Sequence, residues 1–256
     1  MIEETFPAHP LYYPRFLLPN ENTISIMLLC AKFSAEMREI MNNRDTKHFH
    51  VFYSDIDSNI IDQIISEVDE MYERVIHYFQ LKKSPLTFDF YLCPDVETYK
   101  LHAEKSEEEY QDWMVGNTDY LNNRICILSP RVVKDRSFED MVKVIKHEIV
   151  HIAFDALAGP EEVSICVAEG IAVAFAEQIY IPCLNINDHP RCIDLMDEEY
   201  FYENDGYNYS GAYILYFLKK YGKEAFKNIY SGKEIIEKYL YKGFEEEAIS
   251  SIIGAK

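Results

Sequence analysis

Residues 141–154 read MVKVIKHEIVHIAF, and apolar side chains recur in this stretch at the spacing of one helical face. The pattern and its flanking residues predict a helix over residues 138–158. Positions four apart lie on the same side of a helix, so His147 and His151 present two imidazoles to one point. Glu148 lies about 100° round the helix from His147. The stretch therefore predicts a helix that carries part of a metal site.

The predicted metal is a single Zn²⁺ ion, because a catalytic zinc takes three protein ligands and keeps one open position. Glu169, within AEGIA at residues 168–172, is the predicted third ligand. No Lys or Arg occurs between Lys146 and Arg191, so a divalent cation is the natural partner for a buried carboxylate here. Glu148 is left to act as general base.

The spacing of the two histidines does not by itself establish a metal site. A random sequence of this composition contains H-E-x-x-H with a probability of about 3%, so chance stays an alternative. Asp155, four residues beyond His151, is a candidate to orient a ligand histidine, because such rings usually donate their second N–H to an acceptor. The alternative for Asp155 is an ordinary surface aspartate.

The order of patterns predicts an α+β fold, since strands cluster early in the chain and helices late. We expect a mixed sheet lobe with helices and the active-site helix, followed by a mainly helical lobe. The expected strands cover residues 48–55, 86–93, 114–118 and 124–128. The expected organisation is an N-terminal extension with one helix at residues 1–45, a sheet lobe at about 46–158 and a helical lobe at about 159–256.

Composition limits the partners. Forty-four acidic against 25 basic residues give a net charge of −19, which disfavours nucleic acid and anionic membrane surfaces. The N-terminus lacks the basic start and apolar run of a secretory signal, so we expect a cytoplasmic protein. Residues 163–184 are apolar enough to suggest a membrane span, but Glu169 and Glu177 within them favour a buried helix instead.

HEIVH followed by AEGIA resembles the gluzincin metallopeptidases, the clan that contains thermolysin. The likeness is closest to small peptidase MA-like proteins of the minigluzincin type, and the order of elements is similar over roughly residues 48–230. The resemblance implies that His147, His151 and Glu169 bind zinc and that Glu148 activates water. Val173 departs from the pattern, because some gluzincins have an acidic residue four positions after the glutamate ligand.

The resemblance implies two further features. A tyrosine beyond the glutamate helix stabilises the oxyanion in the family, and it falls on Tyr209, with Tyr207 and Tyr213 as alternatives. An edge strand of the family binds an extended peptide by β-augmentation. This strand maps onto the hairpin that contains Asn117, Ile125 and Ile127.

The sequence thus predicts a zinc metallopeptidase acting on a peptide or protein substrate, with Glu148 taking a proton from water and passing it to the leaving amine. A zinc-binding regulatory or interaction module without hydrolysis is the alternative. The sequence leaves the choice between endopeptidase and exopeptidase, the natural substrate and the oligomeric state open.

Overall fold

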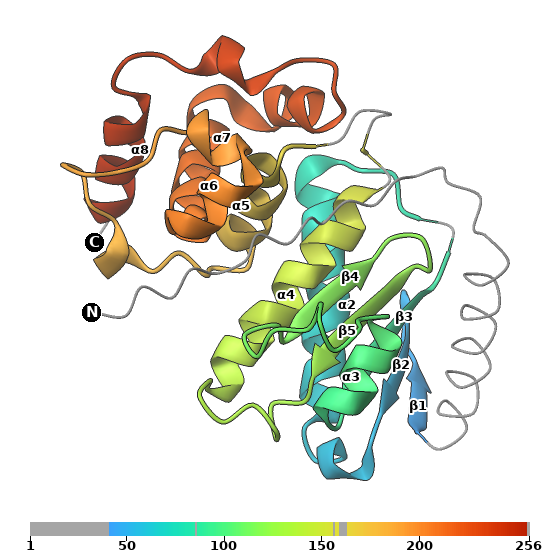
Figure 1. Ribbon diagram of the computed structural model, residues 1–256. Helices are drawn as coiled ribbons and strands as arrows, with labels where there is room; N and C mark the ends of the chain where they lie inside the picture. Colours follow the sequence, from blue (N-terminus) through green and yellow to red (C-terminus); the bar gives the residue numbers. More distant parts are fainter. Residues whose placement is uncertain (1–40, 85, 156, 159–162, 255–256) are drawn as a thin grey trace, which may run out of the picture.

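The computed structural model describes residues 41–84, 86–155, 157–158 and 163–254, and within them the chain forms an α+β fold (Figure 1). The helix expected within residues 1–45 falls on residues 1–40, which lie outside the described residues, and residues 42–45 form a strand. A five-stranded sheet in the order β1-β2-β3-β5-β4 occupies the N-terminal part. Its strands are β1 (Asn42–Asp45), β2 (Phe49–Tyr53), β3 (Phe88–Cys93), β4 (Gly116–Asp119) and β5 (Arg124–Leu128).

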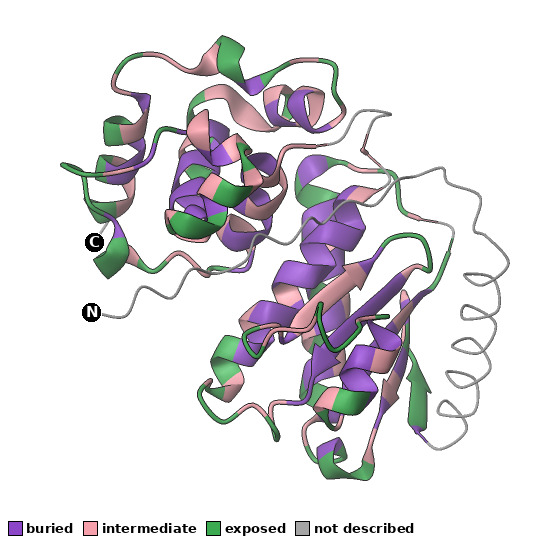
Figure 2. Ribbon diagram, viewed as in Figure 1, coloured by how far each residue is buried: buried purple, intermediate pink, exposed green. Residues whose placement is uncertain are grey.

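The three inner strands β2, β3 and β5 run parallel, and the outer strands β1 and β4 run antiparallel to their neighbours. The strand β5, with the sequence RICIL, is buried along its whole length (Figure 2). Such continuous burial is typical of a parallel strand covered on both faces. The strand β1 is exposed at every position, and its polar sequence NNRD carries no apolar alternation that would have predicted it.

Helices cover both faces of the sheet. Phe88 of β3 packs against Tyr72 of α2 (Ile61–Phe79), whereas Tyr91 of the same strand stacks on His102 of α3 (Val96–His102). Positions of opposite parity point to opposite faces of a strand, so α2 and α3 lie on opposite sides of the sheet. The helix α4 (Phe138–Asp155) packs beside α2 (Figure 1).

The C-terminal part is mainly helical. Its α-helices are α5 (Ile165–Phe175), α6 (Glu198–Glu203), α7 (Gly206–Tyr230) and α8 (Phe244–Ile253). Short 3-10 turns occur at η2 (Ile181–Cys183), η3 (Asp194–Met196) and η4 (Ile236–Tyr239), and a further turn, η1 (Asp55–Asp57), precedes α2. Each helix of the described residues is too short or too polar to span a bilayer.

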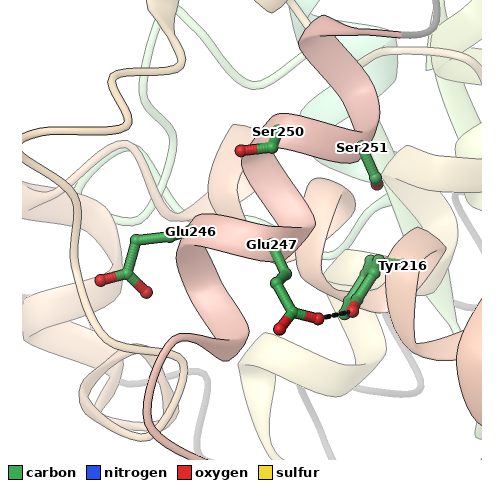
Figure 3. A pocket seen from close by; sticks show the side chains of 5 residues that line it. All are labelled: Tyr216, Glu246, Glu247, Ser250 and Ser251. Atoms are coloured by element: carbon green, nitrogen blue, oxygen red, sulfur yellow. Dashed lines mark hydrogen bonds between the residues drawn. The ribbon is translucent and has the colours of Figure 1, made fainter.

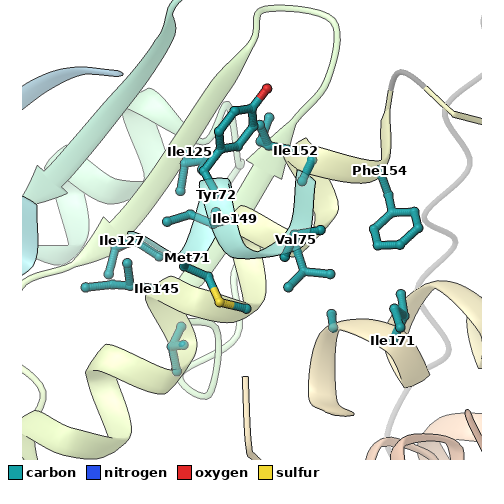
Figure 4. Close-up of a cluster of buried hydrophobic side chains, with 14 of the residues drawn as sticks. Met71, Tyr72, Val75, Ile125, Ile127, Ile145, Ile149, Ile152, Phe154 and Ile171 are labelled. Atoms are coloured by element: carbon teal, nitrogen blue, oxygen red, sulfur yellow. The ribbon is translucent and has the colours of Figure 1, made fainter. Parts of the chain in front are cut away.

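One hydrophobic core joins the two parts (Figure 4). Phe154, near the end of α4, packs against Phe79 of α2 with ring centroids 4.8 Å apart and against Phe226 of α7 at 5.8 Å. Ile125 and Ile127 of β5 face the same core and are fully buried. The helix α4 therefore holds the sheet and the helical part in a fixed relation, and the candidate site lies on this helix.

Some boundaries differ from those expected. The buried helix expected within residues 163–184, α5, ends at Phe175, because Glu177 adopts a left-handed backbone with φ +59° and Gln178 N donates to Val173 O. The helix α6 has the short sequence EEYFYE, which carries no clear apolar period. Its N-cap, the Asp197 side chain, accepts from Tyr200 N at 2.9 Å.

Candidate metal centre

The predicted triad converges in the structure. The Nε2 atoms of His147 and His151 lie 3.0 Å apart. Glu169 Oε2 lies 3.0 Å from His147 Nε2, and Glu169 Oε1 lies 3.4 Å from His151 Nε2. One ligand atom from each residue lies within 4.8 Å of the other two. Three side chains from two helices therefore point at one small volume.

Local structure explains this convergence. The helix α4 begins with a reciprocal cap, in which Ser137 Oγ accepts from Asp140 N and Asp140 Oδ2 accepts from Ser137 N. The helix α5 packs closely on α7 next to Glu169, because a Cβ atom on Gly170 would lie 2.8 Å from Ser210 O. Only glycine permits this approach, which fixes the helix that carries Glu169.

The two histidines are buried, Glu169 is partly buried, and their charges interact. His147 and His151 are 8% and 6% exposed. Burial alone would lower the pKa of His147, but the hydrogen bond and the charge of Glu169 raise that pKa to about 9. Burial would raise the pKa of Glu169, but the charge of His151 and the hydrogen bond with His147 hold it well below its usual range. The site therefore favours an anionic Glu169 with a cation beside it.

Gln178 fixes the orientation of the His147 ring. Its Oε1 atom accepts from His147 Nδ1 at 2.8 Å. A neutral imidazole with its proton on Nδ1 presents a lone pair at Nε2, the atom that faces Glu169. That lone pair would then face carboxylate oxygens, which are also acceptors, unless a proton or a metal ion lies between them. The left-handed turn at Glu177 brings Gln178 into reach, and no pattern in the sequence indicates this role.

The donor set fits zinc. Two imidazole nitrogens and one carboxylate are a known ligand set of catalytic zinc sites, which leave a fourth position open. Gln178 supplies the outer hydrogen bond that orients such a histidine. The Nε2 lone pair of His147 and the carboxylate of Glu169 repel each other unless a cation lies between them. A divalent metal ion can take this place instead of a proton.

Glu148 lies beside the triad but has a different partner. Its Oε2 atom accepts from Thr118 Oγ1 of β4 at 2.6 Å, and the residue is 8% exposed. A Cβ atom on Gly116 would lie 2.8 Å from Glu148 Oε1, so this carboxylate packs against the strand backbone at a position that has no side chain. Glu148 is therefore held between α4 and the open edge of the sheet, outside the ligand triad.

The structure contradicts the placement of Tyr209 at the site. Its hydroxyl accepts from Asn185 N at 3.1 Å and lies 3.3 Å from Asp188 O, so it holds the loop before η3. Tyr213 donates to Pro190 O at 2.7 Å. Of the three candidate tyrosines, Tyr207 lies beside the triad, with its ring centroid 6.3 Å from that of His147. Burial and the charge of Glu169 raise the pKa of Tyr207.

The hypothesis that Asp155 orients a ligand histidine is also wrong in this structure. His147 Nδ1 bonds to Gln178, and His151 Nδ1 has no hydrogen-bond partner among the described residues. Burial, and then the charges of Glu169 and Asp155, raise the pKa of Tyr230, which places Asp155 near that phenol. One turn of spacing along α4 was therefore not enough to bring Asp155 to the ring of His151.

The predicted edge strand is corrected in part. Asn117 lies in β4, which is an edge strand, as expected. Ile125 and Ile127 lie in β5, between β3 and β4, so their assignment to the edge is wrong. Both side chains are fully buried and face the core. Of the two strands of the predicted hairpin, only β4 lies at an edge of the sheet.

No protein-family model and no curated protein matches the chain.

A separate depression lies on the surface between α7 and α8 (Figure 3). Its walls are Tyr216, Glu246, Glu247, Ser250 and Ser251, and Tyr216 donates a hydrogen bond to Glu247. None of these residues belongs to the triad, so the depression has no part in the metal site.

Proposed function

We propose that this protein is a zinc-dependent peptidase that hydrolyses amide bonds with water. The observation that carries the proposal is the convergence of His147, His151 and Glu169 beside a second carboxylate, Glu148, which takes no part in the triad. A purely structural zinc site is usually closed by four ligands and needs no such neighbour. The resemblance of HEIVH and AEGIA to the gluzincin metallopeptidases supports the same function.

Zn²⁺ would be held by His147, His151 and Glu169, and when bound it polarises the amide carbonyl and lowers the pKa of water. Gln178 orients His147 through Nδ1 and so directs its Nε2 into the triad. Glu148 takes the proton of the attacking water and delivers it to the leaving amine, a step typically worth about 10²- to 10⁴-fold. Thr118 orients Glu148 through its hydroxyl.

Tyr207 takes the role that the sequence assigned to Tyr209. Its ring lies beside that of His147, and burial keeps the phenol protonated by raising its pKa. A protonated phenol can donate a hydrogen bond to the oxyanion that develops during hydrolysis. Tyr207→Phe removes this hydroxyl, together with its hydrogen bond to Tyr202, and should lower kcat more than it changes KM.

The test compares the wild-type protein with Glu148→Gln. Both are analysed for bound metal and incubated with a peptide library, and the products are identified by mass spectrometry. We expect about one zinc ion in each protein and cleavage by the wild type only. Zinc in both without cleavage by either would favour the binding module that the sequence left as an alternative. Absence of zinc from both would contradict the proposal.

A further inference from the structure

Four rings connect the triad to the molecular surface. Tyr207 lies beside His147, with centroids 6.3 Å apart. Tyr202 of α6 lies 6.2 Å from Tyr207, and Trp113 lies 6.4 Å from Tyr202. We define the aromatic row as Trp113, Tyr202 and Tyr207. Each ring of the row lies next to the following one, from Tyr207 beside the buried His147 to Trp113 at the surface.

The outer end of the aromatic row is exposed. Trp113 is 51% exposed and Tyr202 is 39% exposed. Large rings are normally buried because their apolar surface is costly to hydrate, and those exposed together often mark a binding site. Trp113 lies three residues before β4 and Tyr202 lies on α6, so both parts of the fold contribute to the row.

The geometry of the aromatic row suits one more ring. The ring planes are tilted by 44° between Trp113 and Tyr202, and by 57° between Tyr202 and Tyr207. Aromatic pairs with centroids about 4.5–7 Å apart prefer offset or edge-to-face arrangements to a face-to-face sandwich. An aromatic side chain that covered Trp113 and Tyr202 would therefore gain ring contacts as well as apolar burial.

We propose that the aromatic row determines specificity, by binding an aromatic side chain of the substrate close to the bond that is hydrolysed. This inference rests on the proposed peptidase function and names its substrate class. Trp113 and Tyr202 are specificity-determining residues, whereas Tyr207 also lies at the reacting atoms. A basic side chain over the indole face is the competing occupant, since the chain is strongly acidic.

The first experiment measures kcat/KM on blocked peptides that differ at one position, with Phe, Ala or Lys beside the cleaved bond. We expect the Phe peptide to exceed the Ala and Lys peptides by about 10- to 100-fold. Trp113→Ala and Tyr202→Ala should remove most of this preference, and Trp113→Phe should restore part of it. Tyr78→Ala, at a phenol that is 44% exposed on α2, is the matched control and should keep the preference.

A second measurement does not need turnover. Trp113 is the single tryptophan of the chain, so its fluorescence reports directly on the aromatic row. We expect the zinc-loaded Glu148→Gln protein to change its emission with the Phe peptide at concentrations about tenfold below those needed for the Ala peptide. Tyr202→Ala in the same background should weaken this response, and Tyr78→Ala should not.

The two measurements separate this inference from the proposed function. Cleavage without a preference for Phe, or with a preference for Lys, would overturn the aromatic row and leave the peptidase intact. A selective fluorescence response of the Glu148→Gln protein, with no cleavage by the wild type, would support the row as a binding site and overturn the peptidase. No response to the Phe peptide would overturn the row.

Discussion

The sheet part and the helical part make different contributions to one site. The sheet part supplies both imidazoles on α4, together with Glu148 and its partner Thr118. The helical part supplies the negative charge of Glu169 and the acceptor Gln178. In the proposed enzyme, the nitrogen ligands and the proton-transfer group would thus come from one part, and the negative charge and the orienting acceptor from the other. A metal at this point would bind both parts and so stabilise their contact.

The largest effect should come from removing the charge that the helical part supplies. Glu169→Gln is expected to lower zinc affinity by at least about 100-fold. Loss of a residue that only hydrogen-bonds to a metal ligand already lowers metal affinity by about 10- to 100-fold. Competition with a chelator of known affinity measures this change. Glu177→Gln is the matched control, since Glu177 is an exposed glutamate two residues beyond α5. Equal zinc affinity in both variants would contradict the role of Glu169.

A smaller loss of zinc affinity should follow when Glu169 is kept and only the acceptor that orients the His147 ring is removed. Gln178→Leu removes the acceptor of His147 Nδ1 and should reduce zinc affinity by about 10- to 100-fold. Gln178→Glu keeps an acceptor there and should restore zinc binding. Gln63→Leu, at an exposed position of α2, serves as the control. If Gln178→Leu bound zinc as well as Gln63→Leu does, His147 would not depend on this hydrogen bond.

The pH dependence of zinc binding tests the coupling between the two parts. Glu169 raises the pKa of metal-free His147 to about 9, so a proton competes with zinc for this ring below that pH. Apparent zinc affinity should therefore rise by up to about tenfold per pH unit between about pH 7 and 9. In the metal-free protein the same raised pKa stabilises the fold at low pH, fully below about pH 6.5, and this contribution is lost as the pH rises through about 9. Zinc affinity that stayed constant over this range would show that no proton is displaced.

The last expected effect is on the stability of the metal-free protein, when the packing of α5 on α7 is loosened. A Cβ atom on Gly170 would lie 2.6 Å from Ile214 Cγ1 of α7, so Gly170→Ala should lower the free energy of unfolding by about 1–3 kcal/mol. Urea unfolding with a chelator present measures this loss. Gly170→Val should lose more, and equal stability of all three proteins would show that α5 and α7 do not need their close approach.

The sequence predicted the sheet part better than the helical part for physical reasons. The period of residues 141–154 and the spacing of His147 and His151 are local properties, and both were confirmed. Glu169 could be predicted because an apolar stretch without Lys or Arg leaves its charge uncompensated. The strand β1 could not, because an exposed polar edge strand has no apolar period.

The wrong predictions depended on which way side chains point. Tyr207 and Tyr209 are two residues apart on α7, about 200° round the helix, so they face opposite directions. The sequence favoured Tyr209, and the structure places Tyr207 beside His147. The resemblance placed Ile125 on the edge hairpin, yet the strand order places it inside the sheet. Gln178 reaches His147 only through a left-handed turn that no pattern indicated.

The most direct test of the central claim is a crystal structure of the zinc-loaded protein with anomalous diffraction measured at the zinc edge. We predict one strong peak about 2.0–2.2 Å from His147 Nε2, His151 Nε2 and a Glu169 carboxylate oxygen, with no fourth protein ligand. A peak elsewhere, or a site without Glu169, would contradict a metal centre shared by the two parts of the fold.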